Sequence, residues 1–100
     1  MKDKLLKIIN HYDVNHQLKY FQSEIFELNE AIMMYEFEEE GGNYYISYKE
    51  HIAEKIADVM VMLEQFRYHY GIKNETIERI MEEKIDRQLQ RIEDETGKTK

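Results

Sequence analysis

Residues 18–35 of the chain read LKYFQSEIFELNEAIMMY, and this stretch decides the fold class. Its apolar side chains recur every three or four residues, at Leu18, Phe21, Ile25, Leu28, Ile32 and Tyr35. That spacing places them along one side of an α-helix that is about five turns long. We therefore expect a helix over about residues 15–37, with Asn15 as its N-terminal cap.

The same periodicity recurs on both sides of this stretch. It predicts three further helices, over about residues 5–12, 48–70 and 74–94, the last capped by Asn74. The segments between them are rich in residues that form turns, with a break expected at residues 10–15, a loop at residues 36–50 around Gly41 and Gly42, and an end at Gly71. Residues 95–100 predict a polar tail.

These elements predict an all-α fold of four, and at most five, helices in one domain over residues 1–100. The absence of proline from all 100 residues suits long uninterrupted helices. Val61 and Met62 lie away from the apolar stripe of their helix, so a single copy of the chain would leave them poorly covered. This favours a homo-oligomer.

Composition excludes several kinds of partner. The chain has 14 Lys and Arg against 21 Asp and Glu, a net charge of −7, which argues against a nucleic-acid polymer or an anionic membrane. There is no cysteine and hence no disulfide or thiolate metal site. No apolar run approaches the roughly 20 residues of a membrane helix, and the N-terminus lacks a signal-peptide core. A cytoplasmic location is the expectation.

Four carboxylates form a pattern with chemical meaning. Glu24 and Glu27 are three residues apart on one helix, and Glu54 and Asp58 are one turn apart on another. Asp58 lies in the apolar run of residues 56–63, where a buried carboxylate is costly unless it is paired or binds a cation. Two antiparallel helices would bring these side chains to one place. Oxygen ligands without histidine or cysteine favour Mg²⁺ or Mn²⁺. The alternatives are ordinary surface charge and pairing of Asp58 with a lysine or arginine.

Residues 21–32 (FQSEIFELNEAI) and 51–63 (HIAEKIADVMVML) together resemble the MazG-like nucleotide pyrophosphohydrolases, which are all-α enzymes. The resemblance covers about residues 14–93 and includes Gln17 and the late helix. It implies a MazG-type helical fold, a homodimer or homotetramer, and Mg²⁺-dependent cleavage of a nucleoside triphosphate to the monophosphate and pyrophosphate, as in control of nucleotide pools.

The resemblance also assigns roles to individual residues. Glu24, Glu27 and Asp58, with Glu54, would hold Mg²⁺, and Glu24 or Glu27 would take the proton of the attacking water. Positive side chains would contact substrate phosphates, namely Lys55, Lys84, Arg87 and Arg91. The alternative for the last three is pairing with Glu82, Glu83 and Asp94 on an exposed helix. Three tyrosines would stack on the nucleobase or, alternatively, pack in a core, namely Tyr44, Tyr45 and Tyr48.

Lys55 departs from the family pattern, because a glutamate is expected three residues before Asp58. Three outcomes are open. Glu54 supplies the missing ligand, or Lys55 contacts phosphate while fewer ligands hold the metal, or Lys55 forms an internal ion pair and the chain is inactive. The last outcome corresponds to a catalytically degenerate helical module that binds a nucleotide or a protein. A purely structural helical oligomer is a third hypothesis.

Overall fold

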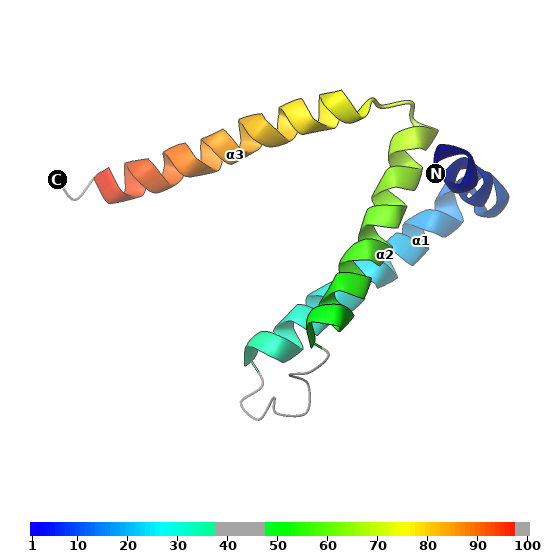
Figure 1. Ribbon diagram of the computed structural model, residues 1–100, viewed down its shortest axis with the longest axis horizontal. Helices are drawn as coiled ribbons and strands as arrows, with labels where there is room; N and C mark the ends of the chain where they lie inside the picture. The colour runs from blue at the N-terminus through cyan, green and yellow to red at the C-terminus, as the bar shows by residue number, and fades with distance from the viewer. Residues whose placement is uncertain (38–47, 98–100) are drawn as a thin grey trace. The chain divides into compact units, whose positions relative to one another are not determined.

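The computed structural model describes residues 1–37 and 48–97. Over these residues the chain forms three helices, α1 (Lys2–Phe37), α2 (Tyr48–His69) and α3 (Asn74–Gly97), as Figure 1 shows. The predicted all-α class is confirmed. The chain divides into two compact units, Met1–Tyr70 and Gly71–Lys100, which are described separately. None of these helices, within the described ranges, combines the length and apolar character needed to cross a membrane.

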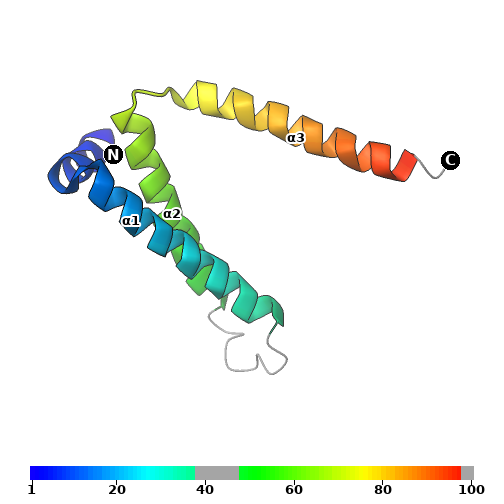
Figure 2. The ribbon, with the colours of Figure 1, turned by 180° about the vertical axis from the view of Figure 1, so that it is seen from behind.

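The break predicted at residues 10–15 is a kink within α1 where two helical segments meet, and the helix predicted over about residues 5–12 lies in the segment before the kink. Asp13 alone leaves helical geometry, with φ 65° and ψ 166°. Its carboxylate Oδ1 accepts a hydrogen bond from the backbone N–H of His16 at 2.9 Å. Asp13 therefore caps the second part of α1, in place of the predicted Asn15. Figures 1 and 2 show the first turns of α1 bent away from the rest of the helix.

The first unit is an antiparallel hairpin of α1 and α2, and these two helices lie side by side in Figures 1 and 2. After the kink, the buried residues of α1 recur at every seventh position, at Gln17, Glu24 and Ala31. From α2, Met62 and Gln65 are buried. The ring edge of Phe21 meets Phe66, with centroids 5.4 Å apart. The interface between the helices is therefore partly polar.

This packing differs from the predicted core in two ways. Leu18, Ile25 and Ile32, from the predicted stripe, are 47%, 44% and 41% exposed. Met62, which we expected to be poorly covered in a single chain, is only 2% exposed, because α1 packs over it. Val61 is 45% exposed, in line with the prediction. The face of α1 that packs against α2 is therefore offset by one residue from the most apolar face of α1.

The ends of α2 and α3 follow the sequence closely. Gly71 has φ +66° and follows the last turn of α2, as predicted. Asn74 begins α3 but does not cap it; the carbonyl of Lys73 accepts from the backbone N–H groups of Thr76 and Ile77, and Asn74 Nδ2 donates to Glu78 Oε1. The helix continues to Gly97, so the first part of the predicted tail is helical. The predicted loop with Gly41 and Gly42 lies largely outside the described residues.

Candidate functional site

The hairpin brings together two pairs of charged side chains, which we call the central cluster: Glu24 and Glu27 from α1, and Lys55 and Asp58 from α2. Within each pair the residues are three apart, so they lie on one helix face. The antiparallel arrangement of α1 and α2 places the two faces against each other. Sequence reasoning predicted this convergence of Glu24, Glu27 and Asp58.

Glu24 is the buried member of the cluster. Only 6% of its surface is exposed, and its Oε2 atom has no hydrogen-bond partner among the described residues. Burial raises the pKa of Glu24 above its ordinary 4.5, the hydroxyl of Tyr20 opposes this by hydrogen bonding to the carboxylate, and the charges of Asp58 and Glu27 raise it further. A cation placed beside Oε2 would remove the cost of this arrangement.

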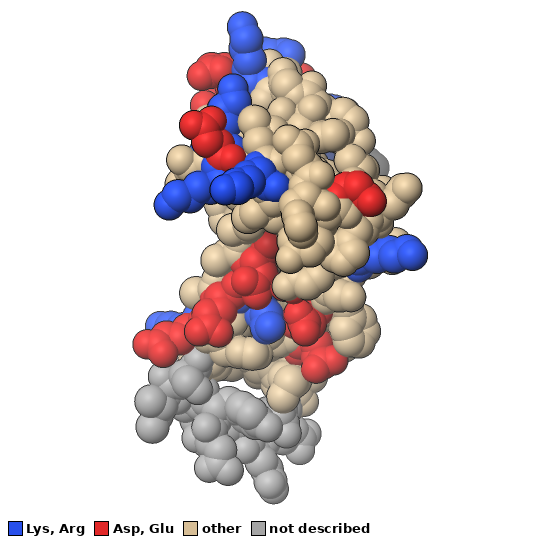
Figure 3. Space-filling model, turned by 90° about the vertical axis from the view of Figure 1, so that its right-hand side faces the viewer, with Lys and Arg blue, Asp and Glu red and all other residues tan. Residues whose placement is uncertain are grey.

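Lys55 is the positive member of the cluster. Its Nζ atom lies 3.5 Å from Glu27 Oε2 and 4.0 Å from Asp58 Oδ2, and its side chain is 22% exposed. Figure 3 shows acidic side chains gathered on the middle of one face of the molecule, with basic side chains near them. The sequence left three outcomes open for Lys55. These side-chain positions match the one in which Lys55 forms an internal ion pair.

The carboxylates fit Mg²⁺ only in part. In the described ranges, no three Asp, Glu or His side chains are gathered tightly enough to hold a metal ion by themselves. Asp58, however, is close enough to Glu24 for its charge to raise the pKa of the Glu24 carboxyl. Mg²⁺ at phosphate sites is usually held by one or two carboxylates together with substrate oxygens. The pair therefore suits Mg²⁺ that arrives with a phosphate ligand, and the orphaned Glu24 oxygen is the atom that fits it.

Glu54 lies outside the central cluster. It lines a groove of about 340 Å³ together with Ala31, Met34, Tyr35 and Tyr48, which we call the tyrosine groove. The rings of Tyr35 and Tyr48 stack on each other there, with centroids 3.9 Å apart. The predicted role of Glu54 as a metal ligand therefore has no support from its position beside Tyr48.

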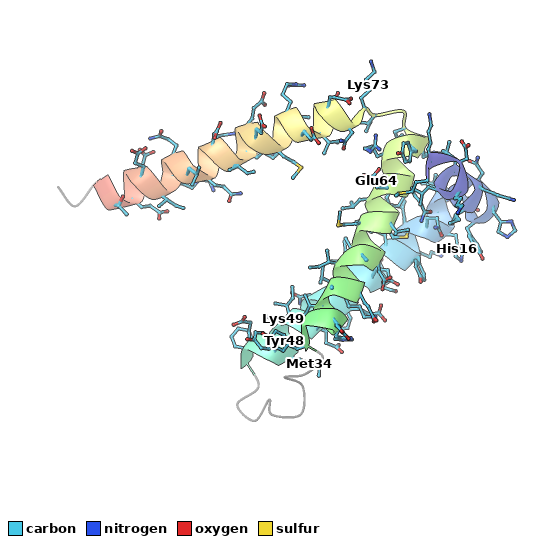
Figure 4. The ribbon with its side chains drawn as sticks, viewed as in Figure 1. His16, Met34, Tyr48, Lys49, Glu64 and Lys73 are labelled. Carbon is cyan, nitrogen blue, oxygen red and sulfur yellow. The ribbon has the colours of Figure 1, made fainter. Side chains whose placement is uncertain are left out.

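A second groove, of about 380 Å³, lies on the other side of the cluster. Its described lining includes Tyr12, His16, Gln17, Tyr20, Asp58 and Gln65, and we call it the glutamine groove. Figure 4 labels His16 near one end of the hairpin and Met34 and Tyr48 near the other. Along one face, the hairpin thus carries a groove, the central cluster and another groove in succession.

The cations predicted to contact phosphate lie on α3, in the second unit. Lys84, Arg87 and Arg91 are exposed, and none of them forms an ion pair with a residue that the structure describes. The alternative pairing with acidic neighbours is not observed either. Glu83 pairs with Arg79 at 3.1 Å, and Asp94 accepts a hydrogen bond from Gln90 at 3.0 Å.

Two features of the site go beyond the sequence prediction. The hydroxyl of Tyr20, four residues before Glu24 on α1, opposes the rise in the pKa of the Glu24 carboxyl. Gln17 Nε2 donates to Gln65 Oε1 at 2.8 Å across the hairpin. The spacing of seven residues between Gln17 and Glu24 is a sequence signal for their shared face, whereas the partner on α2 is not readable from spacing.

Comparison with known proteins adds no relative. The chain matches no protein-family model, no curated protein and no solved structure. The resemblance to MazG-like enzymes therefore rests on the sequence of residues 21–32 and 51–63.

Proposed function

We propose that the chain is a Mg²⁺-dependent nucleotide pyrophosphohydrolase that cleaves a nucleoside triphosphate to the monophosphate and pyrophosphate. One observation carries the proposal, which is the buried and unpartnered Oε2 of Glu24 beside Asp58 and Glu27. A buried carboxylate oxygen without a partner costs free energy, and a bound ion offsets this cost. A divalent cation that arrives with a triphosphate is the ligand that this donor set suits.

Each residue of the cluster has a role in this proposal. Glu24 and Asp58 would hold Mg²⁺, or Mn²⁺, which supplies a Lewis acid for the phosphate oxygens and for the attacking water. Glu27 is about half exposed and would accept the water proton, because it is not needed as a ligand. The hydroxyl of Tyr20 would favour the charged form of Glu24 that holds the metal, because it lowers the pKa of that carboxyl.

Lys55 would exchange its partners in the bound state. Its ammonium already neutralises part of the negative charge of Glu27 and Asp58, at 3.5 and 4.0 Å. A triphosphate bound at the cluster offers stronger acceptors to the same ammonium. In this role Lys55 contacts phosphate, and fewer carboxylates hold the metal than in the family pattern.

A homodimer or homotetramer of MazG type forms part of the proposal. Apolar side chains remain on the outside of the hairpin, with Leu18, Ile25, Ile32, Ile56 and Leu63 each more than two-fifths exposed. On α3, Met81, Ile85, Leu89 and Ile92 are each more than half exposed. Single soluble chains rarely leave so many large apolar side chains uncovered. Lys84, Arg87 and Arg91 would bind substrate phosphate. The cytoplasm, which holds the nucleotide pool, is the expected location.

Pyrophosphate release tests this function. The wild-type chain is mixed with a panel of ribonucleoside and deoxyribonucleoside triphosphates in Mg²⁺, Mn²⁺ or EDTA. We expect metal-dependent release for at least one substrate and a loss of about a hundredfold or more in Glu27→Ala. Glu30→Ala, an exposed carboxylate on the same helix, is the matched control and should retain activity. Equal activity in EDTA, or in Glu27→Ala, would contradict the proposal.

The ion pairs of Lys55 favour a second candidate, a degenerate module that binds nucleotide without cleaving it. In that case the ammonium replaces the metal permanently. Lys55→Glu separates the candidates. If the chain is an enzyme, the variant retains or gains activity; if it is degenerate, only the variant is stabilised against heat by Mg²⁺, while the wild type is not. If the wild type neither hydrolyses nor binds a nucleotide, both candidates are wrong and the hypothesis of a purely structural oligomer remains.

A further inference from the structure

The glutamine groove has a polar floor that the proposed hydrolysis does not use. Gln17, Met62 and Gln65 form part of its lining and are only 4%, 2% and 2% exposed. Amide side chains are costly to bury unless they are hydrogen-bonded. The volume of about 380 Å³ lies in the range of small-molecule sites. The groove therefore combines a buried amide pair with room for a ligand.

One amide donor in this floor has only a weak hydrogen-bond acceptor. Gln17 Nε2 donates to Gln65 Oε1 at 2.8 Å, and Gln17 Oε1 lies 3.1 Å from His16 Nδ1. The remaining amide group, Gln65 Nε2, has the thioether sulfur of Met62 as its partner at 3.7 Å. Sulfur is a weak acceptor. A ligand that brings a carbonyl oxygen or a ring nitrogen to Gln65 would offer a stronger one.

The wall of the groove is aromatic. The ring of Tyr12 stacks on His16, with centroids 4.9 Å apart and planes 19° from parallel, and Tyr12 is 48% exposed. Asp58 is the one carboxylate in the described lining, and neither Lys nor Arg contributes to it. A flat, uncharged heterocycle with acceptor atoms on its edge matches both the rings and the floor.

We propose that the glutamine groove seats the nucleobase of the substrate, stacked against Tyr12 and hydrogen-bonded by the amide of Gln65. The groove is continuous with the central cluster, because Asp58 belongs to both and Tyr20, which lines the groove, lies one helical turn before Glu24 on α1. A base in the groove thus directs the phosphates toward Glu24 and Asp58. The binding of the phosphates at the central cluster rests on the proposed function. The binding of the base rests on the lining of the groove itself.

The tyrosine groove is a poorer base seat. Its described lining contains no amide side chain, so it lacks the group that would hydrogen-bond the edge of a base in the glutamine groove. Glu50 and Glu54 also line it and make it acidic. This assigns the base to side chains other than the tyrosines that the sequence pointed to, of which Tyr44 and Tyr45 lie outside the described residues.

Calorimetric titration of the full chain tests the proposal with two probes. The first is a panel of free nucleosides, which carry no phosphate; the second is inorganic tripolyphosphate with Mg²⁺, which carries no base. We expect Tyr12→Ala and Gln65→Met each to weaken nucleoside binding about tenfold, and to leave tripolyphosphate binding within about twofold. Tyr70→Ala removes an exposed ring outside the groove and should change neither.

The outcomes separate this proposal from the proposed hydrolysis. Saturable nucleoside binding that falls in Tyr12→Ala supports the base seat even if the chain releases no pyrophosphate. Hydrolysis in the wild type without any nucleoside binding, or nucleoside binding that neither variant changes, would overturn the base seat and leave the hydrolysis standing. An equal loss for both probes would overturn it too. Circular dichroism checks the fold, and Tyr12→Ala decides the matter if Gln65→Met unfolds.

Discussion

At the scale of single residues, the chain concentrates its unusual electrostatics in Glu24. Its burial and its unpartnered oxygen disfavour the charged form, and the neighbouring Asp58 and Glu27 add to this effect. Lys55 lies on the Glu27 and Asp58 side of the cluster, at 3.5 and 4.0 Å from their oxygens. The cluster therefore keeps one carboxylate that a cation or a proton would stabilise.

Stability should depend on pH through this residue. Because the folded state raises the pKa of Glu24 above its ordinary 4.5, the folded chain binds the proton more tightly than the unfolded chain does. The contribution to stability is thus fully present below pH 4.5 and is lost as the pH rises through the raised pKa. The side chain of Glu24→Gln stays neutral at every pH. In EDTA, the free energy of unfolding of this variant should therefore increase relative to that of the wild type as the pH rises.

Urea denaturation between pH 4 and pH 8 measures this difference. Glu30→Gln, at an exposed position on α1, controls for the loss of one negative charge. A constant difference between Glu24→Gln and the wild type across this range would show that Glu24 is not buried as described.

At the scale of the elements, the kink of α1 depends on one side chain. Asp13 has φ 65° and ψ 166°, a backbone region that residues with a β-carbon rarely adopt, and its carboxylate caps the following turn through His16. The kink positions Tyr12 and His16 beside the rest of the hairpin, where they line the glutamine groove.

Substitutions at Asp13 should separate its two contributions. Asp13→Ala removes the cap and keeps the strained backbone, so it should lose about 1–2 kcal/mol of unfolding free energy. Asp13→Gly also loses the cap but relieves the strain, so its loss should be smaller. Chemical denaturation followed by circular dichroism measures both. Equal stability of the alanine variant and the wild type would show that the cap is absent in solution.

The helices show how far sequence periodicity reaches. The spacing of apolar residues predicted α2 and the start of α3 to within a few residues, and the spacing of Glu24, Glu27 and Asp58 predicted the core of the cluster. Periodicity did not predict which face of α1 packs against α2, because α1 presents apolar side chains over more than one face and packing selects between them. It left the partner of Lys55 open among several outcomes, since side-chain positions across two helices depend on their register, and the structure shows ion pairs with Glu27 and Asp58.

At the scale of the whole molecule, the uncovered apolar side chains indicate self-association. Ile25 lies between Leu18 and Ile32 on α1 at intervals of seven residues, and all three are more than two-fifths exposed in the single chain. The predicted assembly would cover this line of side chains.

Sedimentation velocity at micromolar concentration tests the assembly. We expect a dimer or tetramer for the wild type, and association weakened about tenfold or more in Ile25→Lys, with a melting temperature that falls on dilution. Gln22→Lys adds the same charge at an exposed polar position of α1 and should leave the assembly intact. A monomeric wild type would contradict the oligomer.

The most direct test of the central claim is hydrolysis in ¹⁸O-labelled water with Mg²⁺, with the products resolved by mass spectrometry. We expect the wild type to convert a nucleoside triphosphate to the monophosphate carrying the label and to unlabelled pyrophosphate, because water attacks the α-phosphorus. Glu24→Gln should form neither product at a comparable rate. Label in pyrophosphate or inorganic phosphate, or no turnover of any triphosphate by the folded wild type, would contradict the claim that the central cluster is a pyrophosphohydrolase site.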